Sequence, residues 1–488
     1  MGPGESVVRK FLVIFLMMAC SGALFAESRE PLACVDTVAL LAGGTSDHTV
    51  SELVRRNGIS FRLEHGIKSV LSNAGADASL IQILEANQPR VGDSTCPAEL
   101  WEAAISAHHN NYAGAEDIIR KLIDKRPNNA ALHLALAYVR QQQGDWNEAF
   151  DEYSTSKELL PSLPEIHNRL AYVFYQSNDS NNAIAEARTA LSIDPRNAEA
   201  HRFLGLGLYI NDQFDLALGA FHQALVLDPT IADTHYDIAM VLNDKGDGSG
   251  AAMEYRKAIR LRPTFWQAHN NLGILLHDAG KLDLAVSEYR EAERLAPAEP
   301  TVRNNLGNTY YDKGDYDSAI AEFTALFQLN PNWKGGHAGL AKVFLAKRDY
   351  QSAVPQLKLA ILDNPTGSAE HRVMGQVLLL TNHQADGLRE LRIAVELDPD
   401  SALAHHLLGT ALFEAQQLNV AAEEFHEALR LEPTAENHYF LAACLMSMGR
   451  DGEALAELEQ ASSLKPGQNL YRARKGELLK LMRENKVQ

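Results

Sequence analysis

Proline recurs at intervals of 34 residues through most of this chain. The ten prolines in register are Pro127, Pro161, Pro195, Pro229, Pro263, Pro297, Pro331, Pro365, Pro399 and Pro433. Between them the same order of residues returns: leucine or isoleucine (once methionine), then glycine or alanine, a small residue twelve positions later, a large apolar residue and another small one. Proline has no backbone N–H and clashes with a continuing helical turn, so it ends a helix. The pattern therefore predicts two packed helices per period, repeated.

The small residues explain how the two helices pack. Glycine follows leucine in Leu204-Gly205, Leu306-Gly307 and Leu408-Gly409, and a missing side chain lets a second helix approach closely. The second helix has a small residue of its own in most units, namely Ala149, Ala183, Ala217, Ala251, Ala285, Ala319, Ala353 and Ala421. We expect small residues to face small residues, so that the pair packs tightly.

One unit shows the whole skeleton. Repeat 266–299 carries His269, Leu272, Gly273, Leu276, Gly280, Ala285, Tyr289, Ala292 and Pro297. This skeleton resembles that of the tetratricopeptide repeat (TPR) family, whose unit is a helix-turn-helix of the same period. The resemblance covers about residues 100–466, in about eleven units. It implies an all-α fold, an α-α superhelical solenoid with a concave groove, in which each unit is stabilised by its neighbours.

The chain divides into four predicted segments: a signal peptide (1–26), a small helical module (37–90), the repeat solenoid (96–466) and a C-terminal capping helix (467–488). The module has enough apolar residues for a small core, and we expect it to cap the first repeat, because a solenoid needs polar outer ends. A separate binding module is the alternative. An enzyme site in 37–90 is a further hypothesis. The lack of a paired acid, base or nucleophile in this segment argues against it.

The N-terminus has the layout of a signal peptide. Arg9-Lys10 precedes an apolar run from Phe11 to Ala26, and a polar stretch follows. Cleavage after Ala26 is the main expectation. The alternatives are a bacterial lipoprotein signal, in which Cys20 becomes the lipidated first residue, and an uncleaved anchor. All three place the repeats outside the cytoplasm, in the periplasm or in the medium, as in an exported bacterial TPR protein.

The other cysteines are Cys34, Cys96 and Cys444. Cys34 and Cys96 bracket the segment without repeats, and in an exported protein they are candidates for a disulfide. Two free cysteines are the alternative. Cys444 lies within a repeat helix, where a buried structural thiol is expected.

Composition argues against nucleic acid as a partner. The formal net charge is −18, and no stripe of Lys and Arg with interleaved aromatic residues occurs before the last twenty residues. A polyanion is disfavoured by such a surface.

Signatures of catalysis are missing from the sequence. It contains no phosphate-binding Gly-x-x-x-x-Gly-Lys-Ser/Thr loop, no Gly-x-Ser-x-Gly motif, no Cys-x-x-Cys and no His-Glu-x-x-His. We therefore expect no enzyme, no cofactor and no metal site.

Histidine recurs at the fourth position of the unit. The nine examples are His133, His167, His201, His235, His269, His337, His371, His405 and His438, and Arg303 interrupts the series. Packed helices lie about 8–10 Å apart, whereas a zinc ion needs each nitrogen at about 2.0–2.1 Å. Histidines of neighbouring units are therefore poorly placed to share a metal, and we expect half-buried imidazoles packed between repeats.

The concave face is the candidate binding surface. In the family it is lined by positions two, five, nine and twelve of the first helix, and this spacing places them on one helical stripe. The residues expected there in repeats two to seven are Tyr138, Asn168, Tyr172, Tyr175, Tyr209, Tyr236, Asn243, Asn270, His277, Asn304, Asn308 and Tyr311. Tyrosine offers area and a polar tip, and asparagine both donates to and accepts from a peptide backbone. A merely wettable wall is the alternative.

Later repeats have an apolar stripe instead, with Leu345, Leu379, Leu403 and Phe413. The sequence thus predicts a non-catalytic scaffold that holds a protein or an extended peptide in its groove. The alternative function is a lipid-anchored assembly factor for an envelope complex or a pilus, with membrane contact only through Cys20 or an uncleaved N-terminus.

Overall fold

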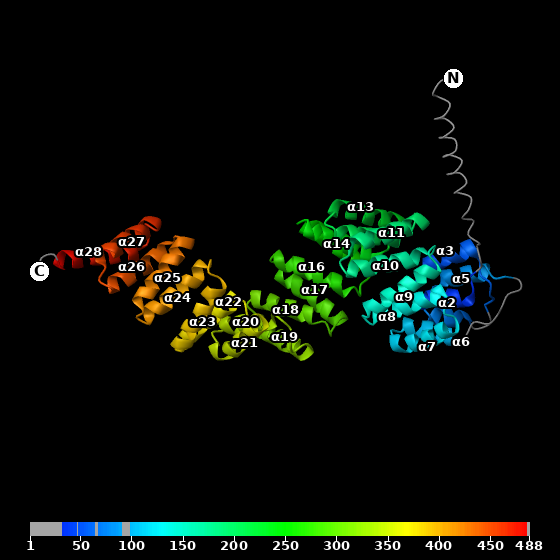
Figure 1. Cartoon of the computed structure of the whole chain (residues 1–488), viewed down its shortest axis with the longest axis horizontal. Coiled ribbons are helices and arrows are strands. Elements are labelled where there is room, and N and C mark those ends of the chain that lie inside the picture. Colours follow the sequence, from blue (N-terminus) through cyan, green and yellow to red (C-terminus); the bar gives the residue numbers. More distant parts are fainter. Residues whose placement is uncertain (1–31, 46, 64–66, 90–97, 486–488) are drawn as a thin grey trace, which may run out of the picture. The chain divides into compact units, whose positions relative to one another are not determined.

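The computed structural model describes residues 32–45, 47–63, 67–89 and 98–485 (Figure 1). Within these residues the chain forms 27 helices, α2 to α28, and the only β-pairing is an isolated bridge between Leu32 and Ile59. The all-α expectation is confirmed. The predicted signal peptide and Cys96 lie outside the described residues. The chain divides into two compact units, residues 1–261 and 262–488.

Unit 1 starts with the small module, and its helices are α2 (Cys34–Ala42), α3 (Asp47–Asn57), α4 (Ile67–Asn73) and α5 (Ala78–Ala86). Five repeats follow. Their first helices are α6 (Ala98–His108), α8 (Ala130–Gln142), α10 (Pro164–Gln176), α12 (Ala198–Tyr209) and α14 (Ala232–Asp244). Their second helices are α7 (Tyr112–Lys125), α9 (Trp146–Leu159), α11 (Ser180–Ile193), α13 (Phe214–Leu227) and α15 (Gly248–Leu261).

Unit 2 contains the other six repeats. Their first helices are α16 (Trp266–Asp278), α18 (Pro300–Asp312), α20 (Gly336–Ala346), α22 (Ser368–Leu380), α24 (Ala402–Glu414) and α26 (Ala435–Ser447). Their second helices are α17 (Leu282–Leu295), α19 (Tyr316–Leu329), α21 (Tyr350–Asp363), α23 (Gln384–Leu397), α25 (Leu418–Leu431) and α27 (Asp451–Leu464). The final helix is α28 (Asn469–Asn485). The eleven helix pairs α6 to α27 match the expected eleven units.

Local signals set the ends of the helices. The second helix of several repeats begins after an aspartate whose carboxylate accepts a backbone N–H two or three residues on, as Asp145, Asp179, Asp315 and Asp349 do. Each of the ten proline-marked helices ends two residues before its proline, as α7 does at Lys125, with Arg126 as the C-cap before Pro127. Local interactions of capping residues and prolines thus define where these helices begin and end.

The glycine after the conserved leucine contacts an aromatic ring. A Cβ on Gly205 of α12 would lie 2.5 Å from the ring of Phe221 on α13, and one on Gly273 of α16 would lie 2.7 Å from the ring of Tyr289 on α17. The same relation holds for Gly307 with Phe323. The expectation that small faces small is thus incomplete: the space left by glycine is filled by a ring sixteen residues later. Phe221, Phe323 and Tyr289 are buried because of it.

The recurring histidines link the two helices of one repeat. His133 Nδ1 donates to Glu152 Oε2 at 2.6 Å, and its Nε2 donates to the Pro127 carbonyl oxygen at 2.8 Å. Glutamate lies nineteen residues after the histidine in seven repeats. The pairs are His133 with Glu152, His167 with Glu186, His235 with Glu254, His269 with Glu288, His371 with Glu390, His405 with Glu424 and His438 with Glu457.

Two of the other repeats keep a side-chain contact at the same spacing, although the pair is not histidine with glutamate. Arg303, which interrupts the histidine series, donates to Glu322 at 3.1 Å, again nineteen residues on. His337 contacts Gln356 at 2.8 Å. His201 has Ala220 at this spacing and is bound only to the Pro195 carbonyl, at 3.3 Å. The expectation of imidazoles packed between repeats is therefore corrected. All of them except His201 link the two helices of their own repeat, and several also bind the proline before it.

Both ring nitrogens of His133 face oxygen acceptors, an arrangement that favours the protonated imidazole. The hydrogen bond to Glu152 raises the pKa of His133 above its ordinary value. For His269, burial opposes the shift and the hydrogen bond to Glu288 outweighs it, so its pKa is also raised. Burial likewise works against Glu186, yet hydrogen bonds from His167 and Lys157 lower the pKa of that carboxylate.

These pairs make stability depend on pH. A histidine whose pKa is raised on folding stabilises the fold fully below its unfolded pKa of about 6.5, and this contribution is lost as pH rises through the folded pKa. We expect Glu152→Gln, which copies the His337–Gln356 pair, to lower the free energy of unfolding by about 1 kcal/mol at pH 6 and by little at pH 9. Urea midpoints at the two pH values measure this.

The reverse substitution is the matched control for this prediction. Gln356→Glu adds a carboxylate opposite His337, so its urea midpoint should rise at pH 6 and gain the pH dependence that Glu152→Gln loses. Equal pH profiles for the parent chain and both variants would contradict the assignment.

Candidate protein-binding surface

The first helices form the inner face of each unit. Successive first helices contact one another, as α10 does with α12 and α12 with α14 in unit 1, and as α16 does with α18 in unit 2. Successive second helices pack less closely. In a curved stack the closer helices lie on the inside of the curve, so the stripe predicted to bind a partner lies on this inner face.

The N-terminal module covers the start of the inner face in unit 1. Helix α2 packs against the first helices α6 and α8 (Figure 1), and its residues share one apolar core with the first repeats. Asn129 Nδ2 donates to Asp36 Oδ1 at 2.8 Å. This continuous core is what a terminal cap requires.

Tyr138 lies beneath this module. A Cβ on Gly44, which has a φ of +64°, would lie 2.5 Å from the Tyr138 ring. Arg169 lies over the same ring, 5.5 Å from its centroid, and donates to the Gly44 carbonyl oxygen at 2.7 Å. The prediction that Tyr138 lines an open groove therefore needs correction: the module occupies that place, and the accessible inner face of unit 1 starts at α10.

Four half-buried tyrosines follow along this face. The rings of Tyr172 and Tyr175 stack with centroids 6.2 Å apart, and Tyr172 also contacts Trp146 and Phe203. Tyr236 contacts Tyr255, with centroids 5.6 Å apart. Tyr209 donates its hydroxyl to Asp244 at 2.5 Å. Burial, with the charge of Asp237 nearby, raises the pKa of Tyr175 to about 12. Tyr175 is therefore neutral near pH 7, and the ring contacts and the hydrogen bond hold the four tyrosines in fixed orientations.

Ion pairs lie between the tyrosines, and sequence reasoning missed them. Glu165 is fully buried, and Arg169 Nε lies 2.8 Å from its Oε1. Burial raises the pKa of Glu165 to about 7. Arg202 donates to Asp237 of the next repeat at 2.5 Å. The inner face of unit 1 thus combines aromatic rings with paired charges.

The predicted asparagines differ in exposure. Asn168 is fully buried and donates to Asn197 at 3.3 Å, so it joins neighbouring repeats and offers no surface to a partner. Asn243, at the end of α14, is exposed.

In unit 2 the polar residues of the inner face also bind the next repeat. Asn270 is buried and accepts from Asn305 Nδ2 at 3.0 Å, and His277 Nε2 donates to Asp312 at 2.8 Å. Tyr311 contacts Tyr316, with centroids 6.0 Å apart. Asn304 and Asn308 are partly exposed.

A spacing of 35 residues recurs in these contacts. It relates Arg202 to Asp237, Tyr209 to Asp244, Asn270 to Asn305 and His277 to Asp312. The sequence signal for these contacts is a pair of polar residues whose spacing is one residue longer than the repeat. They fix the inner face before any partner arrives.

The repeats that begin with α20, α22 and α24 have the predicted apolar stripe. Leu403 of α24 is 51% exposed, while Leu345, Leu379 and Phe413 are partly buried. This stretch of unit 2 is a second, more apolar part of the inner face.

The cysteines have separate environments. Cys34 takes part in a disulfide, and because Cys96 lies outside the described residues, the pairing of the two stays a prediction. Cys444 is free and fully buried in α26, and burial raises the pKa of its thiol to about 11, so a thiolate is disfavoured.

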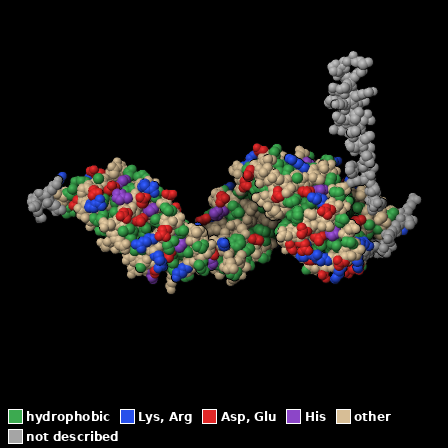
Figure 2. Space-filling view, in the orientation of Figure 1, with side chains coloured by type: hydrophobic (Ala, Val, Ile, Leu, Met, Phe, Trp, Pro, Cys, Tyr) green, Lys and Arg blue, Asp and Glu red, His purple; other side chains and the backbone are tan. Residues whose placement is uncertain are grey.

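The described residues lack two kinds of feature. They contain no cluster of three or more His, Cys, Asp or Glu residues able to hold a metal ion. No helix among them combines the length and the apolar character that a membrane crossing requires. On the face shown in Figure 2, basic side chains lie among acidic ones.

Models of the tetratricopeptide repeat match most of the repeat region. The matches cover residues 108–164, 168–234, 254–287, 275–314, 300–333, 373–435 and 406–469. The chain belongs to the tetratricopeptide repeat family. TPR proteins bind protein partners on the surfaces that their stacked repeats form, and this chain has the same repeat architecture.

Solved structures with similar folds include several TPR proteins. The Cut9–Hcn1 complex of APC/C aligns with a TM-score of 0.49 and 19% identity, over 71% of this chain and 69% of that one. Yeast Tom70 aligns with a TM-score of 0.35 and 15% identity, over 79% and 94%. PilF of Pseudomonas aeruginosa aligns with a TM-score of 0.38 and 20% identity, over 45% and 97%. A comparison with curated protein sequences found no significant match.

Docking of the module on the TPR solenoid depends on Gly44. We expect Gly44→Ala to expose α2 to hydrogen exchange, because the new methyl group meets the Tyr138 ring and a left-handed alanine costs about 1–2 kcal/mol. Hydrogen exchange with mass spectrometry reads the protection of residues 34–42 directly.

Gly58→Ala is the control for this prediction. Gly58 also has a positive φ, of +74°, but nothing lies within 4 Å of its added Cβ. It shares the backbone strain and lacks the contact. If both variants leave α2 equally protected, the module is not held through the Gly44–Tyr138 contact.

Proposed function

We propose that the chain is a non-catalytic scaffold outside the cytoplasm, which binds extended segments of partner proteins along the inner face of unit 1. The observation that carries this proposal is the run of half-buried tyrosines on α10, α12 and α14, namely Tyr172, Tyr175, Tyr209 and Tyr236. Tyrosine combines apolar area with few rotatable bonds, so it loses little entropy when a partner covers it.

The side chains of the inner face are already ordered by contacts with one another, which favours tight binding of a partner. Tyr209 and Arg202 are already bound to the next repeat, through Asp244 and Asp237. A surface whose side chains are ordered beforehand avoids part of the entropic cost of association. The partner therefore meets fixed rings and fixed charges.

The N-terminal module limits the length of this surface. Because the turn at Gly44, directly after α2, covers Tyr138 on α8, a partner segment bound to unit 1 starts at α10. We propose that the module acts as a cap whose position defines one end of the binding surface.

The binding surface is tested by capture. We expect a variant with Tyr172→Ala, Tyr175→Ala and Tyr209→Ala to lose partners from an envelope extract that the parent chain retains. Titration of one such purified partner should show at least about a tenfold loss of affinity, since buried tyrosines are common hot spots. Circular dichroism must show equal helicity.

A control variant changes the opposite side of the same unit. Leu216, Val226 and Met253 lie on the second helices α13 and α15 and are 62%, 76% and 58% exposed. Their replacement by alanine should leave capture unchanged. Retention of the same partners by the tyrosine variant would move the site to the apolar stripe of unit 2 or to the module.

Export is part of the proposal, and the apolar run from Phe11 to Ala26 together with the disulfide at Cys34 supports it. We expect the mature protein to begin at Glu27, as read by N-terminal sequencing of the protein from the periplasm or the medium. A chain that begins at a lipidated Cys20 and leaves the membrane fraction in Cys20→Ser would instead favour the lipid-anchored envelope or pilus factor.

A further inference from the structure

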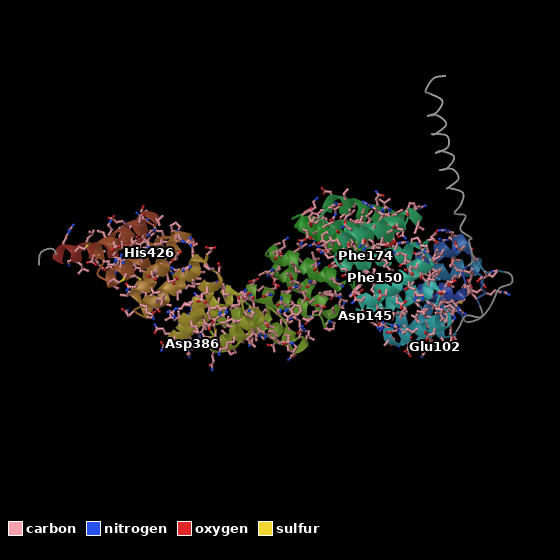
Figure 3. All side chains as sticks on the ribbon, viewed as in Figure 1. Glu102, Asp145, Phe150, Phe174, Asp386 and His426 are labelled. Atoms are coloured by element: carbon pink, nitrogen blue, oxygen red, sulfur yellow. The ribbon has the colours of Figure 1, made fainter. Side chains whose placement is uncertain are left out.

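An aromatic cavity lies at the junction of the second and third repeats, and one of its lining residues, Trp146, also contacts the inner-face residue Tyr172. Its volume is about 560 Å³, and it lies between the start of α9 and the end of α10. Trp146, Phe150 and Phe174 supply its rings, and Phe150 and Phe174 meet edge to face with centroids 5.6 Å apart (Figure 3). We call it the α9–α10 crevice.

The repeats themselves provide a comparison for this crevice. The residue equivalent to Phe150 is Ile184, Leu218, Val286, Ile320, Val354 and Leu388 in other repeats, and the residue equivalent to Phe174 is mostly leucine. Aliphatic side chains therefore satisfy the packing at these positions. Three partly exposed aromatic rings at one junction exceed what packing requires.

The rim of the crevice is acidic. Asp151 lines it and is exposed, and within the described residues no ion pair or hydrogen bond involves its carboxylate. Asp179, also on the rim, caps α11 by accepting from the Asn182 backbone N–H at 3.1 Å. An uncommitted carboxylate beside aromatic faces favours a cation.

Three equivalent junctions contain a cation of the chain itself. Lys245 pairs with Asp215, Lys313 with Asp283 at 2.5 Å, and Lys347 with Asp317 at 2.5 Å, each lysine lying thirty residues after its aspartate. Lys313 also lies over the ring of Tyr310, 5.9 Å from its centroid, and Tyr310 is the equivalent of Phe174.

At the α9–α10 crevice this lysine is missing. Ser177 stands at the position of Lys313, and Asn147 stands at the position of Asp283, and both line the cavity. The cation–π contacts found among the described residues involve other rings. The junction thus lacks both members of the internal ion pair, while two other carboxylates, Asp151 and Asp179, lie beside its three rings.

We propose that the α9–α10 crevice binds the side chain of a lysine on a partner polypeptide. The ammonium group pairs with Asp151 and faces the rings, and the methylene groups pack on Phe150 and Phe174. None of the four inner-face tyrosines lines this crevice, although Trp146 contacts Tyr172, and the proposal does not rest on the binding role of those tyrosines.

The test uses a defined probe, acetyl-Gly-Gly-Lys-Gly-Gly-amide, with the norleucine peptide as its uncharged match. Saturation-transfer NMR on the full chain should show saturable contact for the lysine methylene groups and weaker contact for norleucine. The variant Asp151→Asn with Phe174→Leu should bind the lysine peptide about two- to thirty-fold more weakly, the range that one cation–π contact supports. Phe174→Leu copies other repeats, so the fold is retained.

Two controls separate the crevice from general attraction to an acidic protein. Glu102→Gln removes one exposed negative charge on α6 and should leave binding unchanged (Figure 3). Ser177→Lys with Asn147→Asp restores the internal pair of the other junctions, and should abolish peptide binding while raising the melting temperature.

Undetectable binding of the lysine peptide, equal binding of the norleucine peptide, or equal binding by the parent chain and the filled variant would overturn the proposal. None of these outcomes depends on the tyrosine surface, because all four inner-face tyrosines are intact in every variant used here. Failure of the capture experiment would equally leave this assignment in place.

Discussion

The close approach of the two helices within each repeat is the constraint on which the rest of the structure depends. At Gly205, Gly273 and Gly307 the backbone of the first helix lies against an aromatic ring from the second, at a distance that leaves no room for a side chain. This contact fixes the spacing of the pair. The spacing in turn brings a histidine on one helix within hydrogen-bond distance of a glutamate on the other, and sets the inner faces of successive repeats side by side.

Much of the fold follows from the local effects of proline and glycine on the helices, and these residues can be recognised in the sequence. The prolines at intervals of 34 residues mark where second helices end, and the eleven helix pairs follow from them. The glycine positions were correctly read as close contacts. The residue that contacts each glycine was not predicted. The sequence pattern pairs Gly205 with the small residue Ala217, whereas in the packed helices the ring of Phe221 fills the space beside Gly205.

The binding surface was less predictable, because it depends on contacts between elements far apart in the chain. The stripe rule placed Tyr172 and Tyr209 on the inner face. It gave no sign that the turn at Gly44 covers Tyr138, or that Asn168 is buried between repeats. The histidine series is recognisable in the sequence, but the glutamates that pair with it were not predicted. A glutamate nineteen residues after most of these histidines can be seen in the sequence. Its pairing with the histidine follows only when the two helices are known to be antiparallel neighbours.

The contact between a histidine and the proline before it has a consequence for how the solenoid unfolds. Because His133 binds the carbonyl of Pro127, which ends the preceding helix, the same imidazole contributes to a repeat and to its boundary with the previous one. In a stack of repeats, the boundary energy determines how many units open together. As His133 and His269 lose their protons, the repeats on either side of these two boundaries should open together less often, and fraying of single repeats should begin there.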